Sequence, residues 1–148
     1  MSTKAKQIRE KMITRFEGIS VIAGYKTNVG KRVFDWREEE VSKEEMPAVC
    51  FRDLEEAKSP GAGGTYENIA RIEVEVLSTG VDQGTVDGEL DDLYADILKA
   101  IAVDDMWDGL ADTTEIDAMS KMIALKDQYY GAIKMVLVVE YEHDRWIP

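Results

Sequence analysis

The fold is decided by residues 71–103, which read RIEVEVLSTGVDQGTVDGELDDLYADILKAIAV. The first part alternates charged and apolar residues from Arg71 to Val76, and this period of two predicts a strand with one face in water. Such a strand favours an antiparallel or edge position in a sheet. The second part, from about Thr85 to Val103, predicts a long amphipathic helix because its apolar residues follow the helical period: Val86, Leu90, Leu93, Tyr94, Ile97 and Ile101.

The flanking segments extend this pattern into an α+β domain. Ile8, Met12 and Phe16 recur every four residues and predict a shorter helix over residues 3–17, and residues 19–33 are interpreted as a broken extended hairpin. Further strands are predicted at 48–51, 115–125 and 132–142. We therefore expect a two-layer α+β domain over residues 1–148. It would hold a mostly antiparallel or mixed sheet of four to five strands, with one short N-terminal helix and one long helix packed on it.

Composition excludes several classes of protein. The 148 residues are 45% apolar and 32% charged, which is typical of one globular domain and not of a disordered chain. The net charge of −12 argues against a surface that binds nucleic-acid phosphates, and the single cysteine, Cys50, excludes an internal disulfide. No long apolar run or signal-like N-terminus is present, so we expect a soluble intracellular protein without membrane contact.

The charge is divided unevenly along the chain. Up to Phe34 there are eight basic and two acidic residues, and the remainder holds ten basic and twenty-eight acidic residues. Two interpretations stay open. Either the basic leading segment of one copy meets the acidic flank of the next, or the basic first helix packs over the acidic body of its own chain.

Several segments are predicted to lie outside the core. Residues 35–45 are strongly charged, and the glycine-rich residues 59–64 predict a flexible loop between Glu55 and Tyr66. Trp36 and Trp146 stand in positions that favour either an interface or packing at the domain edge, and for Trp107 we favour the domain edge.

No pattern in the chain predicts a catalytic or metal site. Asp104, Asp108, Asp112 and Glu115 match positions of a calcium-binding loop, but Met106 replaces a required oxygen ligand, so we interpret this segment as an acidic surface connection. The carboxylate pairs are interpreted as solvated faces, Cys50 as a buried inert thiol, and His143 lacks a partner at metal spacing. We expect no cofactor, and a protein that is not an enzyme.

The order of elements resembles a known viral family. The chain is similar to the tail terminator (tail completion, minor tail U-like) proteins of long-tailed bacteriophages and prophages, and to the related tail-to-head joining proteins. The resemblance covers nearly the whole chain and rests on four stretches: the helix ending FEGI at 16–19, PAVCF at 47–51, the strand ARIEVEV at 70–76 with the helix ELDDLYADILKAI at 89–101, and GAI leading into VLVVEY at 131–141.

This resemblance implies a structural role without an active site. It implies a six-membered ring in the virion tail, assembled in the host bacterial cytoplasm, that caps the tail tube, ends tube polymerisation and provides the surface for the head–tail connector protein. DNA would only pass through the ring. From the residues, the candidates for contacts between copies or with partners are Arg9, Lys31, Arg32, Trp36, Glu55, Glu56 and Trp146. Residues 35–45 and 55–66 are candidates for segments that order on docking.

Two other classes of function remain open from the sequence. An acidic inhibitor that mimics DNA could use the carboxylates of residues 87–96 and 104–108 to occupy a basic groove on a host enzyme. A hydrolase with an unrecognised carboxylate or metal site is the other alternative.

Overall fold

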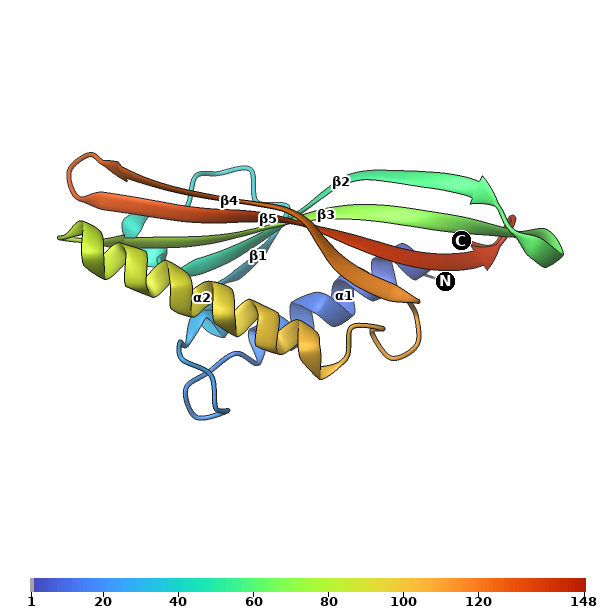
Figure 1. The fold of residues 1–148 in the computed structure, drawn as a ribbon, viewed down its shortest axis with the longest axis horizontal. Helices are drawn as coiled ribbons and strands as arrows, with labels where there is room; N and C mark the ends of the chain where they lie inside the picture. The colour runs from blue at the N-terminus through green and yellow to red at the C-terminus, as the bar shows by residue number, and fades with distance from the viewer. Residues whose placement is uncertain (1) are drawn as a thin grey trace.

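The computed structural model describes residues 2–148. It consists of a twisted sheet with two helices on one face (Figure 1). The strands lie in the order β1-β2-β3-β5-β4; β1 is parallel to β2 and the other neighbours are antiparallel. The predicted α+β class is confirmed. In chain order the elements are α1 (Lys4–Glu17), β1 (Val33–Asp35), β2 (Ala48–Pro60), β3 (Thr65–Gly80), α2 (Gln83–Val103), β4 (Thr113–Leu125) and β5 (Tyr129–Asp144).

The alternating stretch that predicted β3 forms the middle of the sheet. Ile72, Val74 and Val76 are buried toward the helices, while Glu73 and Glu75 lie on the opposite face. On β5, Leu137, Met135 and Ile133 pair with these three apolar residues in register and are buried as well. The period of two therefore defines one face as core and leaves the other largely to solvent.

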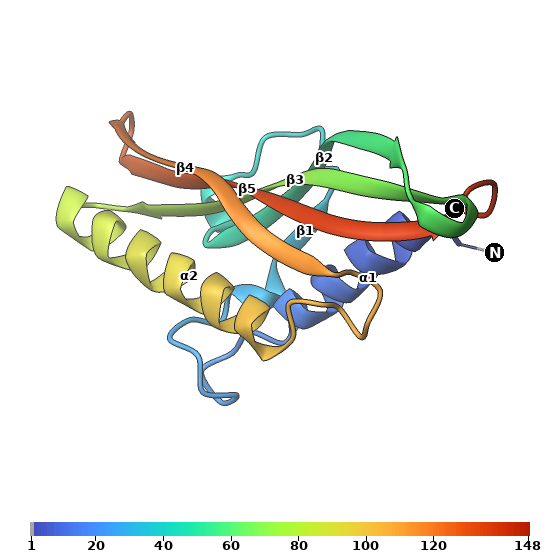
Figure 2. The ribbon, with the colours of Figure 1, turned by 45° about the vertical axis from the view of Figure 1, so that its right-hand side comes forward.

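Both helices lie beneath this buried face, as the two views of Figures 1 and 2 show. The Thr3 hydroxyl accepts the Lys6 N–H at the start of α1, and the Asp82 carboxylate accepts the Thr85 N–H at the start of α2. A Cβ added to Gly131 of β5 would lie 2.6 Å from Leu90 Cδ1, so this glycine lets α2 approach the sheet closely.

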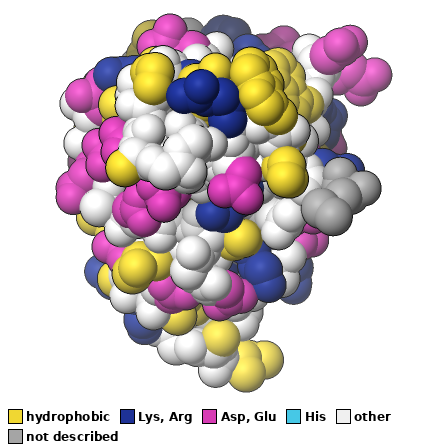
Figure 3. All heavy atoms as spheres, turned by 90° about the vertical axis from the view of Figure 1, so that its right-hand side faces the viewer, with side chains coloured by type: hydrophobic (Ala, Val, Ile, Leu, Met, Phe, Trp, Pro, Cys, Tyr) yellow, Lys and Arg dark blue, Asp and Glu magenta, His cyan; other side chains and the backbone are white. Residues whose placement is uncertain are grey.

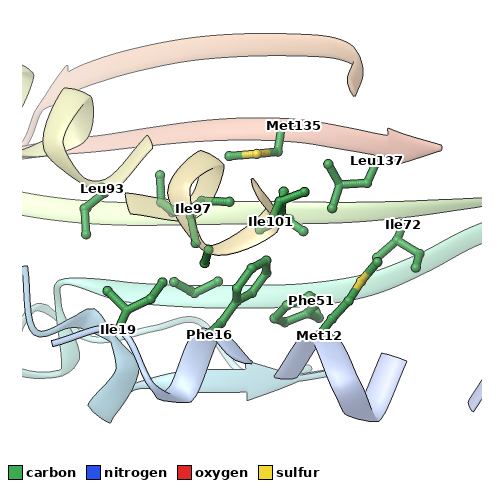
Figure 4. Packing of buried hydrophobic residues seen from close by; sticks show 14 of the residues in the cluster. Met12, Phe16, Ile19, Phe51, Ile72, Leu93, Ile97, Ile101, Met135 and Leu137 are labelled. Atoms are coloured by element: carbon green, nitrogen blue, oxygen red, sulfur yellow. The ribbon is translucent and has the colours of Figure 1, made fainter. Parts of the chain in front are cut away.

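The core lies where α1, α2 and the sheet meet (Figure 4). Met12 and Phe16 of α1 are fully buried, and the Phe16 ring stacks on Phe51 of β2 with 5.0 Å between centroids. Burying each side chain of this size contributes about 1.5–3 kcal/mol. The predicted inner face of α1 is therefore confirmed.

The predicted flexible loop between Glu55 and Tyr66 is wrong. Instead β2 continues to Pro60 and pairs with β3 as far as Pro60 opposite Tyr66. A long hairpin therefore projects past the N-terminal start of α1 (Figure 1). The glycines form only its tip, where Gly63 and Gly64 have positive φ angles of 68° and 78°. The sequence pattern failed here because the outer part of β2 is exposed, so no alternation marks it.

The prediction that Trp107 lies at the domain edge is also wrong. Trp107 is fully buried, and its indole N–H donates to Thr114 Oγ1 at 2.8 Å. The Arg15 guanidinium lies 4.4 Å from the centre of its ring. The chain reaches this position through backbone of positive φ at Trp107 (52°) and Asp108 (60°), which a pattern of hydrophobicity does not reveal.

Two further segments differ from their predictions. The stretch 19–33 is not an extended hairpin; it consists of turns and a short 3₁₀ helix at Val29–Lys31, and only Val33 enters a strand. The charged stretch 35–45 crosses the sheet face opposite the helices (Figure 1) and lines a pocket there with Cys50 and Leu77. Most of it is exposed, as predicted, but Val41 is buried.

Candidate interaction surfaces

The basic residues of α1 are bound to acids of their own chain. The Arg9 guanidinium pairs with Asp35 (3.5 Å) and with Asp53, and the Lys11 ammonium lies 2.9 Å from a carboxylate oxygen of Asp108. For α1, the intrachain interpretation of the charge asymmetry therefore applies. Arg9, a predicted interface residue, is already paired within the chain.

The loop after α1 is held rigid by a buried carboxylate. Asp96 of α2 is 2% exposed, and its two oxygens accept the backbone N–H groups of Lys26 (2.9 Å) and Thr27 (2.8 Å). The Thr27 hydroxyl donates to the same carboxylate at 2.7 Å. Elsewhere in the loop, Lys99 donates to the Gly24 carbonyl at 2.6 Å. Bonds to a charged acceptor are the stronger kind, and Ile19 and Val29 near the two ends of the loop are buried in the core, so the loop is fixed both at its ends and at Lys26 and Thr27.

Sequence analysis missed this role of Asp96, which was grouped with the solvated carboxylates. A signal was present in the spacing. Asp96 follows Leu93 by three residues and precedes Ala100 by four, and both of these are buried, so position 96 lies on the inner face of the helix. A carboxylate in such a position needs internal hydrogen-bond donors.

The braced loop displays apolar and basic side chains. Ile22 is fully exposed at 101% and Val21 is 53% exposed. A groove of about 600 Å³ beside the loop is lined by Lys26, Lys31 and Arg32. Lys26 lies 3.7 Å from Asp92, whereas Lys31 and Arg32 form no ion pair within residues 2–148. We call residues 19–32, which carry these five side chains, the basic loop.

A second surface gathers three of the predicted interface residues. Trp36, Glu55 and Glu56 line a pocket of about 330 Å³ between α1 and the sheet. Its lining is largely apolar: Ala5, Ile8, Leu54, Ala70, Ile72, Val139 and Tyr141. We call this the acidic pocket, because Glu55, Glu56 and Asp53 also line it, together with a single basic residue, Arg71, which pairs with Glu55 at 3.3 Å.

Irregular backbone places two apolar side chains of the acidic pocket. Leu54 is the extra residue of a β-bulge between Asp53 and Glu55, and it is 47% exposed. Trp36, just after β1, has a φ of 53° and is 50% exposed. Its backbone N–H donates to the Phe51 carbonyl at 3.0 Å. Both side chains are available for contact with another molecule.

Trp146 lies apart from both surfaces. It is almost at the C-terminus, packs edge-on against Tyr66 with 5.9 Å between ring centroids, and is largely exposed. Figure 3 views this end of the molecule, where apolar side chains stand among charges of both signs. The structure therefore divides six of the seven predicted interface residues among three places, and the seventh, Arg9, lies on α1 in its ion pairs with Asp35 and Asp53.

The calcium-loop-like residues are used by the chain itself. The Asp104 carboxylate accepts the N–H groups of Met106 (3.0 Å) and Asp108 (2.8 Å), which lowers the pKa of Asp104. Asp112 and Glu115 lie further on and are exposed. No group of three potential metal-ligating side chains occurs within the described residues.

The pocket on the opposite sheet face offers little for chemistry. It has a volume of about 680 Å³ and is lined by charges of both signs. Arg37 and Glu45 form a two-pronged ion pair there, with N–O distances of 2.6 and 2.8 Å, and this pairing lowers the pKa of Glu45 to about 2. Burial raises the pKa of the Cys50 thiol to about 11, so it is protonated at neutral pH and a poor nucleophile.

The carboxylates that could mimic DNA are largely engaged. Lys121 of β4 lies between Asp87 and Asp91 on α2 and pairs with both. Asp96 is buried, and Asp104 and Asp108 are bonded as described above. These contacts leave no continuous row of free carboxylates on α2.

Comparison with known protein-family models and with curated proteins gives no match for this chain. Within residues 2–148, none of the helices is long and apolar enough to cross a membrane.

Proposed function

We propose that this chain is a structural protein of a phage or prophage tail, which assembles head to tail into a ring that caps the tail tube. The ring, a hexamer by family resemblance, ends tube polymerisation and offers a surface to the head–tail connector. Its function arises from assembly and not from catalysis. Its location is then the virion tail.

The observation that carries this proposal is the presence of two unlike surfaces on one chain. The basic loop carries three basic residues and no acidic one, and the acidic pocket is lined by three acidic residues and one basic residue, Arg71; both surfaces also carry exposed apolar side chains. Two different surfaces that fit one another form a heterologous interface, and such an interface generates a closed ring when its rotation closes.

Two other features support the proposal. Strand β4 ends the sheet at one edge, with Ile116, Met119, Met122 and Leu125 exposed, and an uncovered edge of this kind is available for pairing with another chain. The charge of −12 per copy would repel DNA phosphates, so that a genome slides through the ring without binding.

The proposal is tested with tail tubes. Tubes would be assembled from a tail tube protein of a long-tailed phage, with and without this chain, and their lengths and ends measured by cryo-electron microscopy. We expect the chain at one tube end as a ring and an arrest of tube growth. Tubes that grow unchanged, with the chain bound nowhere, contradict the proposal.

A further inference from the structure

We propose that Val21 and Ile22 of the basic loop insert into the acidic pocket of a second copy of this chain. This inference rests on the proposed ring assembly and assigns its interface. The occupant of the pocket is thus a defined segment of the same protein.

The loop has the properties of a docking element. Single exposed apolar side chains are common on protein surfaces and need no explanation. Here, however, the exposed pair lies on a loop that a buried carboxylate holds in one conformation through Lys26 and Thr27. A preformed loop loses little conformational entropy on binding, so contacts made by Ile22 contribute more fully to affinity.

The pocket has the properties of a matching receptor. Its floor includes Ile8 and Tyr141, which are otherwise buried in the core, so an inserted aliphatic side chain would contact tightly packed apolar groups. The half-exposed Trp36 and Leu54 stand where they can cover the inserted side chains. Tryptophans that lose contact with water on binding, as Trp36 would, are enriched among the residues that dominate interface energies.

The charges on the two surfaces are complementary. Lys31 and Arg32 have no ionic partner within the described residues. Glu55 pairs with Arg71 at 3.3 Å and Glu56 with Lys58 at 3.8 Å, but both glutamates are exposed, and three acidic residues against one basic residue leave the pocket lining net negative. Exposed ion pairs contribute only about 0.2–1 kcal/mol each, so the apolar insertion must supply most of the affinity. The charges would set the orientation of the copies and the rate of encounter.

One copy cannot fill its own pocket. The pocket is next to Ala5 and Ile8 near the start of α1, whereas the loop follows the end of that helix at Gly18. Ten helical residues separate Ile8 from Gly18, or about 15 Å. The loop also extends away from the sheet, whereas the pocket lies against it (Figure 1). The insertion therefore joins different copies, as a head-to-tail ring requires.

The test uses variants that disable one surface at a time. Ile22→Asp removes the exposed apolar side chain, and Glu55→Lys with Glu56→Lys reverses the charge beside the pocket. All three residues are exposed, so the loss of stability should be small; because the reversals also remove the pairs of Glu55 with Arg71 and of Glu56 with Lys58, a thermal melt of each variant checks its folding. Val81→Asp is the matched control, an exposed valine outside both surfaces. Mass photometry and sedimentation should show self-association at least tenfold weaker for the first two variants and unchanged for the control.

Two additional measurements identify the contact itself. Lys31→Glu with Arg32→Glu, added to the Glu55 and Glu56 reversals, should restore association that either pair of changes alone weakens. A photo-crosslinking amino acid at position 22 should join one copy to peptides around residues 54–56 or 70–72 of another.

The outcomes separate this inference from the proposed function. If the Ile22→Asp variant forms rings and caps tubes as the unaltered chain does, the insertion is overturned and the tail function stands. Crosslinks from position 22 to a different surface overturn it equally. If the unaltered chain neither self-associates nor binds tubes, both proposals are overturned.

Discussion

The two loops that follow α1 and α2 are both well ordered, but they use their large apolar side chains in opposite ways. The segment after α2 turns inward and buries Trp107 in the core. The loop after α1 is fastened by Asp96 and turns Ile22 outward into water. The first loop buries its largest side chain, whereas the second buries Ile19 and Val29 near its ends and leaves Val21 and Ile22 exposed between them. This difference is the basis of our proposal that the second loop contacts another molecule.

The largest effect is expected at the buried tryptophan. Trp107→Ala should lower the free energy of unfolding by about 3–5 kcal/mol, because it leaves a large cavity and removes the hydrogen bond to Thr114. In a thermal melt this corresponds to a decrease of roughly 6–20 °C. Trp107→Phe should lose much less. A melting temperature unchanged by the alanine variant would mean that the loop after α2 is not part of the core.

The next effect concerns the carboxylate that braces the basic loop. Asp96→Asn should lower the free energy of unfolding by about 2–4 kcal/mol. The side-chain NH2 of asparagine would then face an N–H group of the loop, either that of Lys26 or that of Thr27, where the carboxylate has an acceptor oxygen. Asparagine offers one acceptor oxygen in place of two, so hydrogen exchange should become faster at the one of the Lys26 and Thr27 amides that loses its acceptor. Asp92→Asn is the control. Asp92 lies one helical turn before Asp96 and forms a solvent-exposed ion pair with Lys26, so its replacement should change the free energy of unfolding little. Equal effects of both variants would show that Asp96 does not fasten the loop.

Glu45 is a second carboxylate that holds a loop, but it is partly exposed, so its effect on stability should differ from that of the buried Asp96. Glu45 holds the stretch 35–45 through Arg37, and its pKa of about 2 lies below its ordinary value of 4.5. The pair therefore stabilises the fold above about pH 4.5, and this contribution is lost as the pH falls toward 2.

Glu45→Gln tests this pH dependence. Denaturant unfolding at a series of pH values should show the native chain more stable than the variant at pH 7, with the gap closing between pH 4.5 and 2. The effect should be smaller than that of Asp96→Asn, because the Arg37–Glu45 pair is partly exposed and screened by solvent. A gap that persists at pH 2 would exclude the ion pair as its source.

The sequence predicted those parts of the fold in which one face meets the core and the other meets water. In such segments the positions of the apolar residues show which face is buried. The structure confirms this for the alternation at Ile72, Val74 and Val76 and for the spacing of Ile8, Met12 and Phe16. The outer half of β2 has no such pattern, because both of its faces are exposed to solvent. It is a strand because it pairs with β3, and this pairing leaves no periodic pattern in the sequence of β2.

The interaction surfaces were predictable only in part. Residue type identified Trp36, Glu55 and Glu56, but not that a bulge at Leu54 and the start of α1 would shape a pocket around them. The exposed loop was missed because Val21 and Ile22 look like strand residues in sequence, whereas the chain turns there through local hydrogen bonds from the Ala23 and Gly24 N–H groups to the Ser20 and Val21 carbonyls. Burial of Trp107 likewise depends on turns of positive φ.

The smallest expected effect on stability is at Ile22, and it separates the two loops most clearly. Ile22→Ser should change the free energy of unfolding by no more than about 0.5 kcal/mol, because the side chain is fully exposed and contributes nothing to the core. Denaturant unfolding at low protein concentration checks this. A loop residue that can be changed without loss of stability, yet weakens self-association when changed, acts between molecules. If Ile22→Ser instead destabilised the isolated chain by several kcal/mol, Ile22 would be a core residue like Trp107, and the contrast between the loops would disappear.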